Sequence, residues 1–279
     1  MNALSDSRKY SVADLHSPEA GAATGNMGVL LELKRVCVGY GKLQVVDGVS
    51  LTLAEGEFLS LIGPNGAGKT TLMAAMAGQL PLTAGTLFYS GRDVTDWRED
   101  RRVRAGIGRS YQKTHLFPHL SALDNVQLAV QGRRGISLLH LLGRVPQIVV
   151  EEAELGLQQV GLQTHADTVA ADLSHGEKRK LELAMLLALR PRVMLLDEPT
   201  AGMSLGEATE VLELVTQLKN SGQYGMILVE HKLEVVLKMS HRVMVLHQGR
   251  QLAVGSPDEV MANPAVEEAY LGGYHGKLA

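Results

Sequence analysis

The sequence predicts an α/β fold in which a helical segment interrupts a core built of strands. Strand-like patterns run from residue 29 to about residue 94, helical patterns dominate from about 98 to 190, and strand patterns return afterwards. That order is typical of an α/β core with an inserted helical lobe, here spanning residues 29–273. Residues 1–28 are rich in Ser, Ala, Gly and Asp without periodicity, which predicts a flexible tail, and residues 274–279 are expected to form a short C-terminal tail.

The individual elements follow from local apolar patterns and turn residues. Expected strands cover residues 31–38, 51–53, 58–62, 86–89, 92–94, 193–196, 226–229, 243–246 and 250–254. Expected helices cover residues 70–79, 121–130, 149–160 and 176–189. Ser90-Gly91 and Gln248-Gly249 stand between paired strands and predict two hairpins. The short apolar run at 58–62 leads into a glycine-rich loop and predicts a buried strand.

Composition restricts the class of protein. The 279 residues are 45% hydrophobic, which is enough for one large core, and the formal charge of −3 argues against nucleic acid as a main partner. The one cysteine, Cys37, excludes an internal disulfide, favours a reducing compartment and is expected to pack in or near a strand. No apolar run approaches the ~20 residues of a membrane helix, and the N-terminus does not resemble a signal peptide.

A basic stretch precedes the first long helix of the insertion. Its members are Arg98, Arg101, Arg102, Arg104 and Arg109. A charge run of this kind is favoured as the solvated face of a helix, and docking to a partner is the alternative.

A glycine-rich segment after the buried strand carries the clearest functional pattern. It fits G-x-x-x-x-G-K-[ST] and consists of Gly63, Pro64, Asn65, Gly66, Ala67, Gly68, Lys69 and Thr70, with Thr71 following. Such a loop lets successive backbone N–H groups reach phosphate oxygens, and the following helix turns its positive end toward the anion. We expect Lys69 to contact the β and γ phosphates of ATP and the Thr70 hydroxyl to ligate Mg²⁺.

A second apolar run ends in two acids and supplies the other half of a nucleotide site. Asp197 and Glu198 follow the strand at 193–196, at the sheet edge where ligands of open α/β sheets gather. We expect Asp197 to hold Mg²⁺ through water and Glu198 to polarise the water that attacks ATP. The alternative of two ordinary surface acids is disfavoured once a phosphate loop is present. The sequence therefore predicts an ATPase that uses Mg²⁺.

A pentapeptide before these acids resembles the LSGGQ signature of ABC-type ATPases. It reads Leu173-Ser174-His175-Gly176-Glu177, and its His and Glu are substitutions familiar in the amino-acid-uptake branch of that family. The resemblance covers residues 31–270. It implies a P-loop NTPase core with an antiparallel β subdomain and an inserted α-helical subdomain at about 98–190.

Other landmarks of the family appear in order along the chain. The resemblance assigns Tyr40 to stacking on adenine, Gln112 to a catalytic and Mg²⁺-contacting loop, and His231 to the γ-phosphate. Residues 201–204 lie where the D-loop belongs, although Ser204 replaces the usual Asp or Asn. Taken alone, Tyr40 would be a core or turn aromatic and His231 a surface histidine.

Ser174 and Glu177 also fit a capping box, which by itself predicts only the start of a helix. A capped N-terminus can still present free amides and a positive dipole to an anion. The resemblance implies that this anion is the γ-phosphate bound by a second ATPase subunit, either the same chain or a paralogue. Two ATP molecules would then lie between the subunits of a head-to-tail dimer.

The segments around Gln112 and at 268–272 resemble ATP-binding subunits of branched-chain amino acid importers and their urea and amide relatives. The match is closer to the paralogue with the longer central insertion. It implies two permease subunits, a periplasmic solute-binding protein that acts indirectly, and a peripheral position on the cytoplasmic face of a bacterial inner membrane. The alternatives are the ATPase of a lipid or lipopolysaccharide exporter and an ABC ATPase outside transport.

Overall fold

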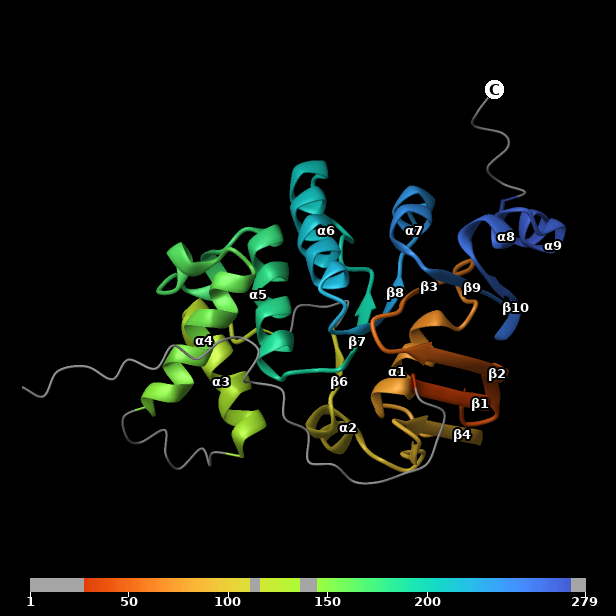
Figure 1. The fold of residues 1–279 in the computed structure, drawn as a ribbon, viewed down its shortest axis with the longest axis horizontal. Coiled ribbons are helices and arrows are strands. Elements are labelled where there is room, and N and C mark those ends of the chain that lie inside the picture. Colours follow the sequence, from red (N-terminus) through yellow and green to blue (C-terminus); the bar gives the residue numbers. More distant parts are fainter. Residues whose placement is uncertain (1–27, 111–115, 136–144, 272–279) are drawn as a thin grey trace, which may run out of the picture.

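The computed structural model describes residues 28–110, 116–135 and 145–271 (Figure 1). Its strands are β1 (Val29–Tyr40), β2 (Leu43–Ala54), β3 (Phe58–Ile62), β4 (Ala84–Tyr89), β5 (Arg92–Asp93), β6 (Ile107–Arg109), β7 (Val193–Asp197), β8 (Gly225–Val229), β9 (Arg242–His247) and β10 (Arg250–Gly255). Its α-helices are α1 (Lys69–Ala77), α2 (Glu99–Ala105), α3 (Ala122–Arg134), α4 (Gln147–Gln159), α5 (His175–Ala188), α6 (Leu205–Asn220), α7 (Leu233–Met239), α8 (Pro257–Met261) and α9 (Pro264–Val266). The two expected tails and Gln112 lie outside the described residues, apart from Gly28.

Two sheets form the framework of the fold. One is antiparallel with strand order β2-β1-β4-β5, and it contains the first predicted hairpin. The other has the order β10-β9-β3-β8-β7-β6 and is parallel except for β10, which forms the second predicted hairpin with β9. Because β3 and β7 run in the same direction on either side of β8, the loops that follow them emerge at one edge of the sheet.

The buried core is aliphatic and lies on both faces of the larger sheet. Helix α1 packs between the two sheets, where it contacts β1, β2, β6 and β7. On the other side, α3, α4 and α5 pack against one another and α6 packs against α5. Figure 1 shows α3, α4 and α5 apart from the antiparallel sheet. Strands β3, β7 and β8 are buried at every residue, which explains why their sequences are almost entirely apolar apart from Ser60 and Asp197.

Two members of the basic stretch contradict the favoured interpretation as a solvated face. Arg98, Arg101 and Arg104 are exposed, but Arg102 is 1% exposed and the Arg109 side chain 7%. The Arg102 guanidinium donates to the carbonyls of Ala75, Met76, Val94, Thr95 and Trp97. Burial lowers its pKa to about 10. Arg102 therefore satisfies carbonyls at the C-terminal end of α1 and fixes that helix to the segment before α2.

The region expected to be helical also contains a strand. β6 lies within residues 98–190 but pairs with β7 at the edge of the core sheet, so the helical insertion does not begin at residue 98. Helices α6 and α7 follow β7 and β8 and supply the crossovers that parallel strands require. In the described ranges no helix is long and apolar enough to cross a membrane.

Candidate active site

The glycine-rich loop connects β3 to α1 and has backbone conformations that require its glycines. Gly63, Gly66 and Gly68 have φ values of 148°, 80° and 100°. A Cβ built on Gly63 would lie 2.1 Å from the Leu246 carbonyl oxygen of β9. Gly63 is therefore needed both for its conformation and for the close approach of another strand.

Lys69 lies at the start of α1 with its ammonium turned back onto the loop. Its Nζ donates to the carbonyl oxygens of Gly63 at 2.8 Å and Pro64 at 3.1 Å. Burial lowers the pKa of Lys69, and the nearby carboxylates of Glu198 and Asp197 oppose that shift. The cation of the loop therefore shares one electrostatic environment with Asp197, at the end of β7, and with Glu198, which follows that strand.

The turn between β9 and β10 braces the phosphate loop, a contact that sequence reasoning missed. The Gly249 N–H donates to the Ala67 carbonyl at 3.1 Å, and the Gly249 carbonyl accepts from the Asp47 N–H at 2.8 Å. The sequence identifies Gln248-Gly249 only as a hairpin turn. This turn connects the loop to the antiparallel sheet through β2.

Asp197 is the last residue of β7 and is fully buried. Its Oδ2 accepts from Arg109 Nη2 at 2.7 Å, and its backbone carbonyl accepts from Arg179 Nη2 at 3.0 Å. Its Oδ1 is buried and has no hydrogen-bond partner among the described residues. A buried acceptor without a donor is costly, so this oxygen is available to accept from a bound water or ligand.

Glu198 and His231 are brought together at the same edge of the sheet. Glu198 has a φ of 47°, a left-handed conformation that is uncommon for a residue with a Cβ. Its N–H donates to the Val229 carbonyl at 3.0 Å, and its Oε1 lies 2.8 Å from His231 Nε2. With a proton on Nε2 the imidazole donates to the carboxylate. The turn thus directs Glu198 away from the strand and holds its side chain against His231.

Glu230 supports this turn, although its sequence position gave no sign of a role. It is buried, and its two carboxylate oxygens accept from the Thr200 hydroxyl at 2.6 Å and from the His231 N–H at 3.0 Å. It therefore links the segment after β7 to the segment after β8. Both segments carry a predicted catalytic residue, and Glu230 fixes their separation.

The capping box predicted for the signature segment is confirmed. Ser174 caps α5, its Oγ accepts from the Glu177 N–H at 3.2 Å, and the Glu177 side chain accepts from the Ser174 N–H at 2.8 Å. Not every amide at this helix start is free, however, since the Gly176 N–H donates to Glu207 Oε1 at 3.0 Å. Glu207 belongs to the capping box that Ser204 begins on α6. Ser204 thus fills the capping role that Asp or Asn can also fill.

Most of the remaining predicted site residues are exposed or half-buried, and Gln112 lies outside the described ranges. Tyr40 ends β1 and is 54% exposed, as an aromatic that stacks on a ligand must be. Asn65, Gly66 and Thr70 are exposed and Thr71 is half-buried. Gln112 cannot be placed, because residues 111–115 are not described.

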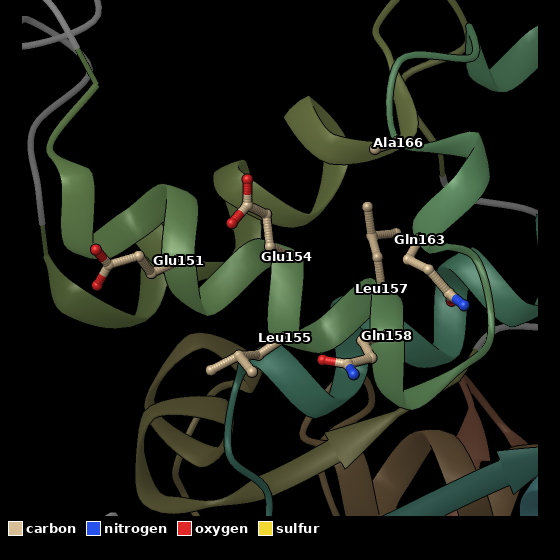
Figure 2. Close-up of a pocket in the computed structure, with 7 residues that line it drawn as sticks. All are labelled: Glu151, Glu154, Leu155, Leu157, Gln158, Gln163 and Ala166. Atoms are coloured by element: carbon tan, nitrogen blue, oxygen red, sulfur yellow. The ribbon is translucent and has the colours of Figure 1, made fainter. Parts of the chain in front are cut away.

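A separate hollow lies against α4 on the helical side of the molecule (Figure 2). Its lining consists of Glu151, Glu154, Leu155, Leu157, Gln158, Gln163 and Ala166. Among the described residues its lining includes two carboxylates and no basic side chain, so the chemistry of this lining does not suit a phosphate. This hollow is distinct from the nucleotide site.

The family of the chain follows from its similarity to known proteins. The family model described as "ABC transporter" matches residues 46–201, which is more than half of the chain. This chain belongs to the ABC transporter ATPases. It therefore binds and hydrolyses ATP to drive transport. A second model, described as "Branched-chain amino acid ATP-binding cassette transporter", matches residues 250–276 of this ABC ATPase.

Curated relatives cover nearly the whole ABC domain. The branched-chain amino acid transport protein LivG of Salmonella typhimurium is 34% identical over 249 residues, and BraF of Pseudomonas aeruginosa is 32% identical over 249; each match covers 87% of this chain and 98% of the relative. The lipopolysaccharide export protein LptB of Acidithiobacillus ferridurans is 35% identical over 246 residues, which covers 88% of this chain and 98% of the relative.

Solved structures of ABC cassettes have the same fold. A nucleotide-free ATP-binding cassette has a TM-score of 0.76 at 26% identity, over 87% of this chain and 98% of the other. A cassette in its ADP conformation has a TM-score of 0.76 at 28% identity, over 88% of this chain and 99% of the other. The predicted α/β fold of the ABC ATPases is thus confirmed.

Proposed function

We propose that this ATPase powers uptake of branched-chain amino acids, or of a related small polar solute such as urea. The observation that carries the proposal is the match of residues 250–276 to the branched-chain amino acid cassette model, which lies outside the general ABC match. The names of LivG and BraF support the same solute class. The permeases and a periplasmic binding protein would bind the solute itself, and ATP hydrolysis by this subunit would power its uptake.

Lipopolysaccharide or lipid export is the second candidate. It is favoured by LptB of Acidithiobacillus ferridurans, whose 35% identity is close to the 34% of LivG and the 32% of BraF. Identity over the shared ATPase core reports the common hydrolytic machinery and not the cargo. The C-terminal match is the feature that ranks uptake first.

The geometry supports a defined division of labour in hydrolysis. Lys69 would leave the carbonyls of its own loop to contact the β and γ phosphates, and Glu198 would accept a proton from the attacking water. His231 would hold the Glu198 carboxylate and contact the γ-phosphate. Gln112 keeps its proposed role near the metal and Tyr40 its role on adenine.

The residues present fit a bound Mg²⁺. Among residues 28–110, 116–135 and 145–271, no cluster of three or more His, Cys, Asp or Glu could hold a metal ion. One buried carboxylate oxygen on Asp197 and the Thr70 hydroxyl are nevertheless the donors that Mg²⁺ takes when it keeps waters and nucleotide phosphates as its other ligands. Bound there, the ion would neutralise charge on the phosphates.

A second subunit would complete the site. Figure 1 shows α1, which begins at the phosphate loop, and α5, which begins at the signature, on different parts of the molecule with β7 between them. Ser174 and His175 at the start of α5 are exposed. We therefore propose that residues 174–177 contact ATP held by a facing subunit. Two permeases would hold this dimer at the cytoplasmic face of the inner membrane.

Purification of the tagged full chain from detergent-solubilised membranes of its host tests this function. We expect a pair of permease proteins and a second ATPase subunit to co-purify. After reconstitution with the solute-binding protein encoded in the same genome, leucine, isoleucine or valine should stimulate ATP hydrolysis. Co-purification with lipopolysaccharide-assembly proteins, without stimulation by these amino acids, would instead select the export function.

A further inference from the structure

Arg109 connects Asp197 of the nucleotide site to Gln79, which lies just beyond the end of α1, although the sequence shows it only as part of a basic stretch. It is the last residue of β6, which pairs with β7 so that Arg109 lies opposite Leu195. From there its Nη2 reaches Asp197 Oδ2 at 2.7 Å, with the two side chains 7% and 0% exposed. This contact is a buried ion pair on the acid that we propose holds Mg²⁺.

Hydrogen bonds join the ends of β6 and β7 beside the ion pair between Arg109 and Asp197. The Ser110 N–H donates to the Leu195 carbonyl at 2.9 Å, and the Asp197 N–H donates to the Ser110 hydroxyl at 3.3 Å. The guanidinium is held from its other side as well, because Nη1 donates to Gln79 Oε1 at 2.7 Å. Gln79 Nε2 in turn donates to Glu99 Oε1 at 2.8 Å. Arg109 is therefore oriented by contacts at both ends of its guanidinium.

The contacts on Asp197 are asymmetric. One carboxylate oxygen is engaged by Arg109, whereas Oδ1 is buried and has no partner among the described residues. A carboxylate that rotated freely would offer either oxygen to a ligand. Here the fixed guanidinium of Arg109 determines which carboxylate oxygen of Asp197 stays available to a ligand and in which direction that oxygen faces.

We propose that Arg109 is a positioning residue for the metal step of ATP binding: it holds Asp197 Oδ2 so that Oδ1 faces the water shell of the nucleotide's Mg²⁺. The inference rests on the proposed role of Asp197. Residues that orient the ligands of a metal typically change metal affinity by ~10–100-fold when they are replaced. An ion pair that served only stability would affect nucleotide binding equally with and without the metal.

The test compares binding of a fluorescent, non-hydrolysable ATP analogue to the full chain in excess Mg²⁺ and in EDTA. For each protein the ratio of the Kd in EDTA to the Kd in Mg²⁺ measures the gain from the metal. We expect Arg109→Gln to reduce this ratio at least ~10-fold while its Kd in EDTA stays within about twofold of wild type. Arg109→Lys, which retains the charge but not the two-sided geometry, should reduce it by about threefold.

Arg104→Gln is the matched control, because Arg104 is exposed and belongs to the same basic stretch. Its ratio should equal that of wild type. An unchanged or increased ratio in folded Arg109→Gln would overturn the inference. If that variant does not fold, an unchanged ratio in Arg109→Lys would do so. A wild-type chain that gains nothing from Mg²⁺ would instead contradict the proposed metal role of Asp197.

Discussion

Glu198→Gln is expected to lower ATP turnover by ~10³-fold while ATP affinity stays within about twofold of wild type. The amide has the size of the carboxylate and keeps an oxygen that can accept from His231, 2.8 Å away in the native protein. It cannot take a proton from the attacking water. The change therefore removes the base and preserves the geometry around it.

Steady-state phosphate release and equilibrium nucleotide binding check this prediction together. Glu234→Gln is the matched control, since Glu234 is an exposed carboxylate in the first turn of α7 and should leave both quantities unchanged. ATP-bound dimers should accumulate in the Glu198→Gln protein, because closure no longer ends in hydrolysis. Near-normal turnover would remove Glu198 from its proposed role.

Lys69→Met is expected to weaken ATP binding by ~100-fold, which corresponds to about 2.7 kcal/mol. Methionine retains an unbranched apolar stem in the buried position but cannot donate to phosphate oxygens. It also removes the hydrogen bonds that Lys69 donates to the carbonyls of Gly63 and Pro64. The loss should be confined to nucleotide affinity, because the glycines still determine the backbone of the loop.

Isothermal titration of ATP into the purified chain measures the effect of Lys69→Met. Lys238→Met, which replaces an exposed lysine in the last turn of α7, is the control and should bind like wild type. An ATP affinity of Lys69→Met within threefold of wild type would mean that Lys69 does not contact the phosphates.

The parts of the site that are contiguous in sequence could be predicted from it. The phosphate loop and the acid pair each combine a buried apolar run with functional residues at or directly after the end of the strand, so the run and its next few residues reveal both. The capping box at Ser174 is equally local, and the same Ser-x-x-Glu pattern at Ser204 would have predicted the start of α6.

Residues whose partners are distant in sequence were missed or misread. Arg102 and Arg109 belong to a run of charges in the sequence. That run does not reveal that Arg102 donates hydrogen bonds to backbone carbonyls of α1, or that Arg109 donates to a carboxylate 88 positions away. Glu207 bonds an amide 31 positions earlier and Glu230 a hydroxyl 30 positions earlier. Such contacts arise only when the strands and helices that carry them have packed.

In the proposed dimer, the chain holds ATP with one set of residues and completes another subunit's site with a second set. The substitution His175→Asp tests these two sets of residues separately, because it changes only the second set. An acid in the first turn of α5 is compatible with the helix dipole, so folding should be preserved, but it would repel a phosphate approaching from outside.

The decisive experiment makes two measurements on His175→Asp. The first is the ATP affinity of the lone chain, and the second is the ATP turnover of the variant in the assembly where wild type is active. We predict an ATP affinity within about twofold of wild type and a turnover lowered ~100-fold or more. A repulsion of about 2.7 kcal/mol between the new carboxylate and the partner-bound phosphate would lower the turnover by that factor. Loss of ATP affinity in the lone chain, or turnover equal to that of wild type, would contradict a site divided between two subunits.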